Sequence, residues 1–224
     1  MKSVAVVTAT TGRESLLQTI ASVKKQTYPC NHYIFVDGKH ELPEAAQNHE
    51  NIIWLPKPTG GNGMMNGGIV AASAYLVTED YLCWIDDDNW IDPDHIESLV
   101  NVIEDKPYAY SLRKLVEPDG TFWANDDCES LGHHADLIDL NCYLMKRDLA
   151  TGLAPCWYQT TGELMIGDRY VWAMLKQNNI PYAASGKYTV NYRLNPKRDL
   201  KPMFFQGNIM NKAKHNNVLP WSKT

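Results

Sequence analysis

The sequence YLCWIDDDNWIDPDHIE, residues 81–97, joins an apolar stretch to three consecutive acids and then to a helix start. Residues 81–85 form a continuous apolar run of strand length, which is typical of a buried strand in a parallel sheet. Asp92 and Pro93 suit the N-cap and the first position of a helix, and apolar residues then follow helical spacing up to residue 103. A strand, an acidic loop and a helix in this order predict an α/β fold.

The three acids, Asp86, Asp87 and Asp88, repel one another unless water screens them or a cation lies nearby. Mg²⁺ and Mn²⁺ prefer oxygen ligands, and often only one or two of these come from the protein. A calcium-binding loop that starts at Asp86 is excluded, because Trp90 and Ile91 stand where it needs an oxygen ligand and a turn glycine. Two interpretations stay open: a divalent-metal site, or a solvated turn before a helix.

The sequence upstream of this stretch alternates between strand-like and helix-like segments. Strands are predicted at residues 3–8, 32–38 and 51–55, and helices at 13–26 and 69–77. Such alternation predicts a mainly parallel sheet that is flanked by helices and joined by right-handed crossovers. Thr8, Asp37 and the acids at 86–88 all fall at predicted carboxyl ends of strands, where the ligands of such sheets bind.

Beyond residue 107 the pattern becomes mixed. We expect a hairpin at 108–123, a strand at 136–145, a helix at 167–179, strands at 180–185 and 188–193, and a short helix within the tail 196–217. No repeat, low-complexity tract or linker separates these segments. The chain is therefore predicted to be one domain, residues 1–224, with a nucleotide-binding half at 1–107 and a smaller, mixed half at 108–224.

The composition is that of an ordinary soluble globular protein, with 44% hydrophobic and 21% charged residues among 224. The net charge of −5 argues against a general nucleic-acid binder. The five cysteines have no C-x-x-C spacing, so no zinc or redox motif is indicated and a reducing compartment is favoured. Neither a signal peptide nor a transmembrane segment is predicted, and we expect a cytoplasmic protein.

The stretch GGNGMMNGG, residues 60–68, is the most glycine-rich part of the chain. It is not a P-loop, and no G-x-G-x-x-G fingerprint follows the first strand directly, so a Rossmann dinucleotide site is not indicated. Taken alone, this stretch predicts only a flexible loop.

Taken together, the motifs resemble a short family 2-like glycosyltransferase with the GT-A fold. The resemblance rests on their order, which is VAVVTATTGRESLLQTIASVKKQTYP (4–29), YIFVDGK (33–39), the glycine-rich stretch and the acids of the D-x-D motif at 86–88. A weaker similarity covers IGDRYVWAMLKQNNIPYAAS (166–185). The resemblance implies a Rossmann-like sheet flanked by helices, with a nucleotide-sugar-binding half at 1–107 and an acceptor and catalytic half at 108–224.

The resemblance also implies roles for individual residues. Asp86 would face the ribose and the metal-bound waters, Asp88 would bind Mn²⁺ or Mg²⁺, and Asp168 would be the catalytic base. The other residues that it assigns to the nucleotide-sugar are Thr8, Ala9, Thr10, Arg13, Asp37, Met65, Asn66 and Asp87. His215 in the tail is a further candidate metal ligand.

Two of these positions depart from the family pattern. Met65 replaces the usual arginine before Asn66, so Arg13 is expected to supply the missing charge. Gly167 replaces the usual acid before Asp168, which leaves open that Asp168 only stabilises a helix start. Arg193 and the basic tail could close over a diphosphate or form a solvated face.

The expected activity is metal-dependent transfer of a sugar, with inversion, from a nucleoside-diphosphate sugar to an acceptor hydroxyl. A UDP-sugar is favoured as donor. The acceptor, whether saccharide, lipid-linked or protein, stays open, and a second copy of this short chain could complete its site. Two other functions stay open as well: a sugar nucleotidyltransferase, and a catalytically silent module that binds nucleotide-sugars.

Overall fold

The computed structural model describes the whole chain except residues 61–65, 128–136, 162–163, 166, 215 and 218–224. Its strands are β1 (Val4–Thr10), β2 (Asn31–Val36), β3 (Ile52–Trp54), β4 (Tyr81–Trp84), β5 (Trp90–Ile91), β6 (Tyr108–Val116), β7 (Phe122–Asn125), β8 (Tyr143–Lys146), β9 (Thr160–Thr161), β10 (Leu164–Met165) and β11 (Tyr182–Arg193). Its helices are α1 (Leu16–Lys24), α2 (Gly67–Leu76), α3 (His95–Ile103), α4 (Arg147–Trp157), α5 (Gly167–Gln177) and α6 (Lys201–Lys214). Two 3₁₀ turns, η1 (Glu44–Ala46) and η2 (Leu140–Cys142), complete the described elements.

One side of the main sheet is parallel and has the strand order β3-β2-β1-β4. From β1 the chain moves outward through β2 to β3 and then returns to β4 on the other flank of β1. The crevice outside the carboxyl ends of β1 and β4 is therefore a topological switch point, where α/β proteins bind their ligands. The acids at 86–88 follow β4 directly and so lie at this switch point.

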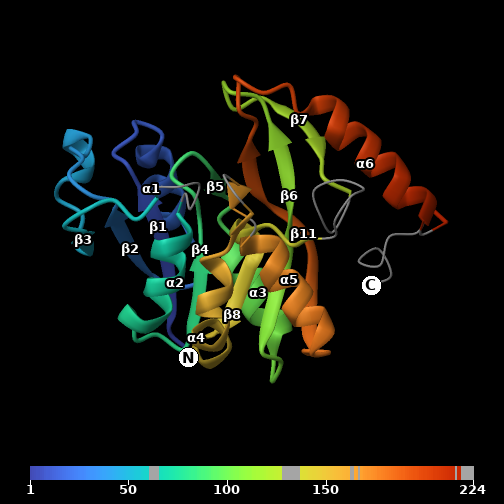
Figure 1. The fold of residues 1–224 in the computed structure, drawn as a ribbon, viewed down its shortest axis with the longest axis horizontal. Coiled ribbons are helices and arrows are strands. Elements are labelled where there is room, and N and C mark those ends of the chain that lie inside the picture. The colour runs from blue at the N-terminus through green and yellow to red at the C-terminus, as the bar shows by residue number, and fades with distance from the viewer. Residues whose placement is uncertain (61–65, 128–136, 162–163, 166, 215, 218–224) are drawn as a thin grey trace.

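The other side of the sheet is mixed and continues in the order β8-β6-β11-β5. β8 runs antiparallel to both of its neighbours, β4 and β6. β11 is parallel to β6 and antiparallel to β5, and β7 forms a hairpin with β6. In Figure 1, α2, α4 and α5 lie side by side across the front of the sheet, whereas α6 extends away from it at the upper right. The predicted α/β class is confirmed.

The core explains why the apolar runs are continuous. The first four residues of β1 and all of β4 are buried, because helices cover both faces of the parallel strands. The ring of Trp157, at the end of α4, lies 5.9 Å from that of Trp84 and 6.2 Å from that of Tyr143. A small separate cluster of Leu115, Leu194 and Phe204 fastens α6 to the sheet.

Three predictions about local structure were wrong, and one helix was missed. The strand expected at 136–145 begins only at Tyr143, because Asp139 caps the preceding turn η2 by accepting the backbone N–H of Asn141. The helix after the acids begins at His95 and not near Asp92. The two strands expected at 180–185 and 188–193 form one strand, β11, whose register shifts around Gly186 (φ +67°). The sequence analysis also missed α4, in which Gly152 and Pro155 weaken the helix signal.

In the described part of the chain, no helix is both long and apolar enough to span a bilayer.

Candidate functional site

Thr10, at the carboxyl end of β1, forms hydrogen bonds to the residues that follow β2 and β4. Its hydroxyl donates to Asp87 Oδ2 at 2.6 Å, and its carbonyl accepts the backbone N–H of Asp37 at 2.9 Å. The same hydroxyl accepts the backbone N–H of Gly12 at 2.9 Å. Gly12 has φ +83°, and a Cβ there would lie 2.0 Å from the carbonyl oxygen of Glu41, so only glycine fits this turn.

The three consecutive acids have different environments. Asp87 is buried, and this burial raises the pKa of its carboxyl group. Asp88 has a side chain that is 39% exposed, and its Oδ2 lies 2.8 Å from Nη1 of Arg13. The same guanidinium nitrogen lies 3.4 Å from Asp87 Oδ1. Asp88 therefore faces the crevice, whereas Asp87 holds the loop to β1.

Asp86 is surrounded by side-chain amides. Asn66 donates to its Oδ1 at 2.8 Å, and Asn141 donates to its Oδ2 at 2.9 Å. The oxygen of Asn141 accepts the backbone N–H of Asp86 at 2.7 Å. Burial, and then repulsion from Asp139, raise the pKa of Asp86 to about 7, although the bond from Asn141 acts in the opposite direction. A carboxyl group with such a perturbed pKa in a crevice is typical of a functional site.

A buried cation, Arg113, organises a second group of acids behind the first. Its Nε donates to Asp126 Oδ2 at 3.0 Å, its Nη1 donates to Asp139, and its guanidinium lies 4.5 Å from the centre of the Tyr192 ring. Asp168, in the first turn of α5, is close enough to Asp139 for that charge to raise its pKa, in addition to the larger effect of burial. The charge of Asp139 thus raises the pKa of both Asp86 and Asp168.

The other residues that were predicted to bind the nucleotide-sugar or the metal differ in where their side chains point. Asp37 accepts the backbone N–H and the hydroxyl of Thr59 at 2.6 and 2.9 Å, so its carboxylate holds the loop after β3. Thr8 is fully buried, and its hydroxyl lies 2.9 Å from Nε2 of His32. Ala9 lies beside Asp86 and Asn66 in a small crevice. Met65 and His215 lie outside the described residues.

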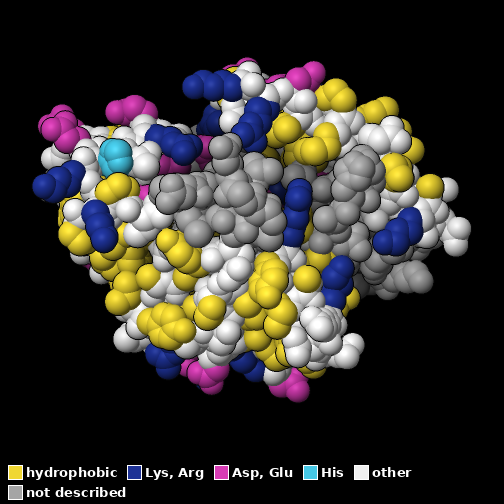
Figure 2. Space-filling view, viewed as in Figure 1, with side chains coloured by type: hydrophobic (Ala, Val, Ile, Leu, Met, Phe, Trp, Pro, Cys, Tyr) yellow, Lys and Arg dark blue, Asp and Glu magenta, His cyan; other side chains and the backbone are white. Residues whose placement is uncertain are grey.

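Arg193, at the end of β11, reaches the acidic loop from the other side of the crevice. Its Nε donates to the carbonyl of Asp88 at 3.0 Å, and its guanidinium lies 5.0 Å from the centre of the Trp90 ring. Its backbone N–H donates to Asn89 at 2.8 Å. Figure 2 shows dark-blue basic and magenta acidic side chains together at a hollow in the upper edge of the molecule.

The described residues contain no group of three or more histidine, cysteine or acidic side chains that could enclose a metal ion. Both oxygens of Asp86 already accept amide donors, which leaves Asp88 as the acid of the loop with an exposed carboxylate. Mg²⁺ and Mn²⁺ often take one or two carboxylates and complete their shell with substrate phosphates and water. The acidic loop fits a cation of that kind, held by Asp88, and not a site built from protein ligands alone.

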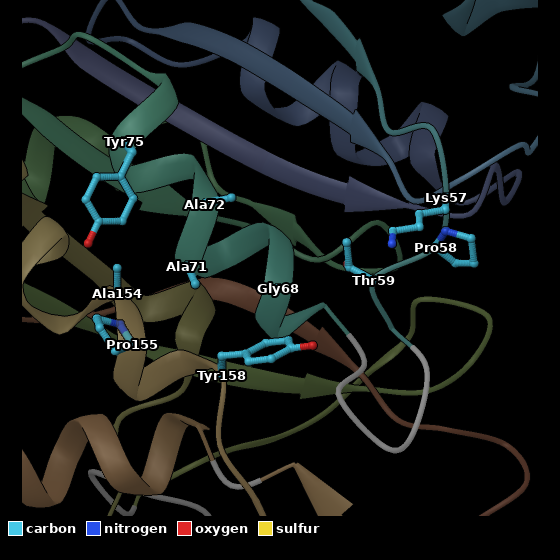
Figure 3. Close-up of a pocket in the computed structure, with 10 residues that line it drawn as sticks. All are labelled: Lys57, Pro58, Thr59, Gly68, Ala71, Ala72, Tyr75, Ala154, Pro155 and Tyr158. Atoms are coloured by element: carbon cyan, nitrogen blue, oxygen red, sulfur yellow. The ribbon is translucent and has the colours of Figure 1, made fainter.

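A groove of about 670 Å³ adjoins the site on the outer side of α2 (Figure 3). It is lined by Lys57, Pro58, Thr59, Gly68, Ala71, Ala72, Tyr75, Ala154, Pro155 and Tyr158. Thr59 links the groove to Asp37, and the close contact of Gly167 with the carbonyl of Trp157 links the end of α4 to the start of α5. The groove therefore lies between the loop after β3, which contacts Asp37, the helix α2 and the end of α4.

The residues that the sequence analysis missed are Asn89, Arg113, Asp139 and Asn141. Of these four, only Asp139 and Asn141 could have been noticed in the sequence, because they are polar residues inside the apolar run at 136–145. Polar side chains in such a run often have partners in the core.

An acidic loop that two arginines contact lies at the switch point of the sheet, where α/β proteins bind their ligands. The model of the Glycosyl transferase family 2 matches residues 3–155, which is more than half of the chain. The protein belongs to this family, and the predicted resemblance is confirmed.

Solved structures with a similar fold include TarS of S. aureus. Its fragment 1–349 gives a TM-score of 0.60 at 14% identity, over 86% of this chain and 60% of that one. The same fragment in complex with UDP-GlcNAc gives 0.62 at 15% identity, over 89% and 60%. In complex with UDP it gives 0.57 at 14% identity, over 88% and 62%. The chain thus spans about three fifths of the fragment, and the likeness confirms the GT-A fold. No curated protein sequence matches the chain.

Proposed function

We propose that the protein is a metal-dependent glycosyltransferase that moves a sugar, with inversion, from a nucleoside-diphosphate sugar to an acceptor hydroxyl. The observation that carries the proposal is the exposed carboxylate of Asp88 at the switch point, paired with Arg13 and contacted by Arg193 through its backbone. Membership of the family and the UDP-GlcNAc complex of TarS support a UDP-sugar as donor. In this proposal residues 1–107 form most of the donor site, and residues 108–224 supply the base, the acceptor side and one donor contact, Arg193.

The diphosphate of the donor would bind between Arg13, Asp88 and Arg193. Arg13 is 55% exposed, so its guanidinium can turn from Asp88 toward a phosphate at little cost. Asp88 would hold Mn²⁺ or Mg²⁺, which neutralises the charge that develops on the leaving diphosphate. Asp86 keeps the loop in place through its amide partners.

Asp168 is the proposed general base. Burial and the charge of Asp139 raise its pKa, so its carboxylate holds a proton more readily than an exposed aspartate does. It would take the proton of the acceptor hydroxyl as that oxygen attacks the sugar. A single base that faces the leaving group implies one direct displacement, and hence inversion, by analogy with inverting glycosidases.

The test compares donor binding with donor turnover. We expect UDP with Mn²⁺ to raise the melting temperature of the wild type, because a ligand of the native state stabilises it by mass action. Asp88→Ala should lose this shift, whereas Asp168→Asn should keep the shift and lose hydrolysis of UDP-sugars. Asp94→Asn, which changes an exposed acid paired with Lys187, is the matched control.

Three outcomes would contradict parts of the proposal. A shift with UDP and Mn²⁺ but no turnover in any variant would favour a silent binding module. A shift with another nucleotide alone would remove UDP as the donor. Formation of UDP-sugar from UTP and a sugar phosphate would identify a nucleotidyltransferase instead.

A further inference from the structure

The helix α6 carries apolar residues on its outer side as well as on its inner side. Its inner side holds one buried aromatic ring, Phe204, and two asparagines, Asn208 and Asn211. Their side-chain amides donate to backbone carbonyls of Asn125 and Asp127 at 3.0 and 3.2 Å. The side of the helix that faces the protein therefore combines the apolar contacts of Phe204 and Met203 with polar contacts of the two asparagines.

The outer side of α6 is mainly apolar, with Gln206 as its polar member. Phe205, Ile209 and Met210 are 63%, 49% and 44% exposed. Pro202 and Ala213 are exposed too, so apolar residues recur at the spacing of one helical face along the 14-residue helix. Figure 2 shows yellow side chains gathered at the upper right, where Figure 1 places α6. An apolar face of this kind marks an interaction surface.

The charge around this face indicates what it contacts. Residues 194–217 contain five basic residues and one acid, a net charge of +4 in a chain whose net charge is −5. Lys197 and Arg198 are exposed just before the helix, and Lys214 is exposed in its last turn. Lys201 and Lys212 form ion pairs with Glu117 and Asp127. A helix with an exposed apolar face and basic flanks is typical of segments that lie in the interface of an anionic bilayer.

We infer that α6 docks the protein onto an anionic lipid surface, with Phe205, Ile209 and Met210 among the acyl chains and the basic flanks against the headgroups. The helix is about 21 Å long at 1.5 Å per residue, so it lies on a bilayer and does not cross it. This surface does not depend on the proposed catalytic function, because none of the three apolar residues lies in the site.

The test is co-sedimentation of the full chain with vesicles of phosphatidylcholine that contain about one third phosphatidylglycerol. We expect binding at low salt, loss of most binding at high salt, and little binding to pure phosphatidylcholine. Neutralising the basic pair (Lys197→Gln, Arg198→Gln) should lower the partition coefficient about 25-fold, or about fivefold for each charge. Replacing the three apolar residues by serine should lower it at least about tenfold.

Two matched variants keep the test specific. Trp54→Ser removes an aromatic side chain of similar exposure (53%) from β3, at the far edge of the sheet. Lys24→Gln with Lys25→Gln removes a basic pair from the end of α1. Both should bind vesicles as the wild type does, and circular dichroism should show all variants folded.

The inference is overturned if the wild type does not sediment with anionic vesicles, or if the α6 variants bind as well as the matched ones. It is equally overturned if the wild type is a dimer by light scattering, the serine variant is a monomer, and neither binds vesicles. That result would assign the face to a second copy of the chain.

Discussion

Asn141 supports Asp86 through two hydrogen bonds, and only one of them depends on the charge of the carboxylate. Its oxygen accepts the backbone N–H of Asp86, whether or not the acid is ionised. Its amide donates to Asp86 Oδ2, and this bond is strongest when the acid is ionised. Replacing Asn141 with alanine should therefore cost more stability at alkaline pH than at acidic pH.

The magnitude follows from these two contacts. Leaving the backbone N–H of Asp86 without an acceptor should cost about 1–2 kcal/mol at any pH. Losing the bond to the ionised carboxylate should add about 2 kcal/mol, since hydrogen bonds to charged groups contribute about 1.5–3 kcal/mol. We expect a loss of about 1–2 kcal/mol at pH 5.5 and about 3–4 kcal/mol at pH 8.5.

The sign of the pH dependence comes from the pKa of Asp86, which is about 7 in the folded protein and about 4 in the unfolded chain. A raised native pKa means that stability present at acidic pH is lost as the pH rises through the folded pKa. The donor on Asn141 lowers that pKa, so the Asn141→Ala variant should have a still higher one. The additional loss of stability in the variant therefore begins near pH 7 and is complete above the pKa that Asp86 has in the variant.

Urea unfolding, followed by the fluorescence of the seven tryptophans, measures the loss at both pH values. The matched control is Asn178→Ala, an exposed residue whose amide donates to a helix carbonyl at 2.9 Å, and it should change stability by less than about 0.5 kcal/mol. Equal losses at pH 5.5 and 8.5 would refute the coupling to Asp86. In an Asp86→Asn background, the difference between the two pH values should disappear.

Three further predictions concern the surroundings of the site. Replacing Arg113 with methionine removes the cation from the buried Asp126 and the partly buried Asp139, and should lower the free energy of unfolding in urea by about 3–5 kcal/mol. A loss below about 1 kcal/mol would show that the two aspartates do not depend on Arg113. Burial lowers the pKa of His32 to about 3, so stability that is present above pH 6.5 is lost as the pH falls, by about 2 kcal/mol between pH 7 and 4.5. His32→Gln should remove this part of the stability loss at acidic pH. An unchanged dependence of the free energy of unfolding on pH would contradict the prediction. In Gly167→Ala the added Cβ would lie 2.5 Å from the carbonyl oxygen of Trp157, so the melting temperature should fall by an amount equivalent to about 1–3 kcal/mol, and an unchanged value would contradict the close contact.

The parallel part of the sheet could be predicted because each of its strands is encoded locally. A continuous apolar run of strand length, such as that of β1 or β4, is typical of a strand that is buried on both faces. The switch point follows from strand order, so the acids after β4 could be placed at a ligand crevice before any coordinates were known. Nothing more than the order of segments along the chain was needed for this.

The support of the acidic loop could not be predicted, because it depends on which distant strand lies beside β4. β8 pairs with β4 in antiparallel register, and this pairing brings η2 with Asn141 under Asp86. No local pattern encodes that choice of neighbour. For the same reason, the chain between residues 180 and 193 was predicted as two strands, although pairing with β6 carries it through the irregularity at Gly186.

The interleaved order of the sheet also constrains how the chain can fold while it is being synthesised. β4 gains its second neighbour only when Lys146 can pair with Tyr81, and β5 has no partner until Val190 can pair with Ile91. A nascent chain that ends near residue 107 would therefore expose an open strand edge, which is a site for aggregation. The acidic loop would receive its contact from Arg193 only after residue 193, which is more than 100 residues beyond Asp88, had left the ribosome.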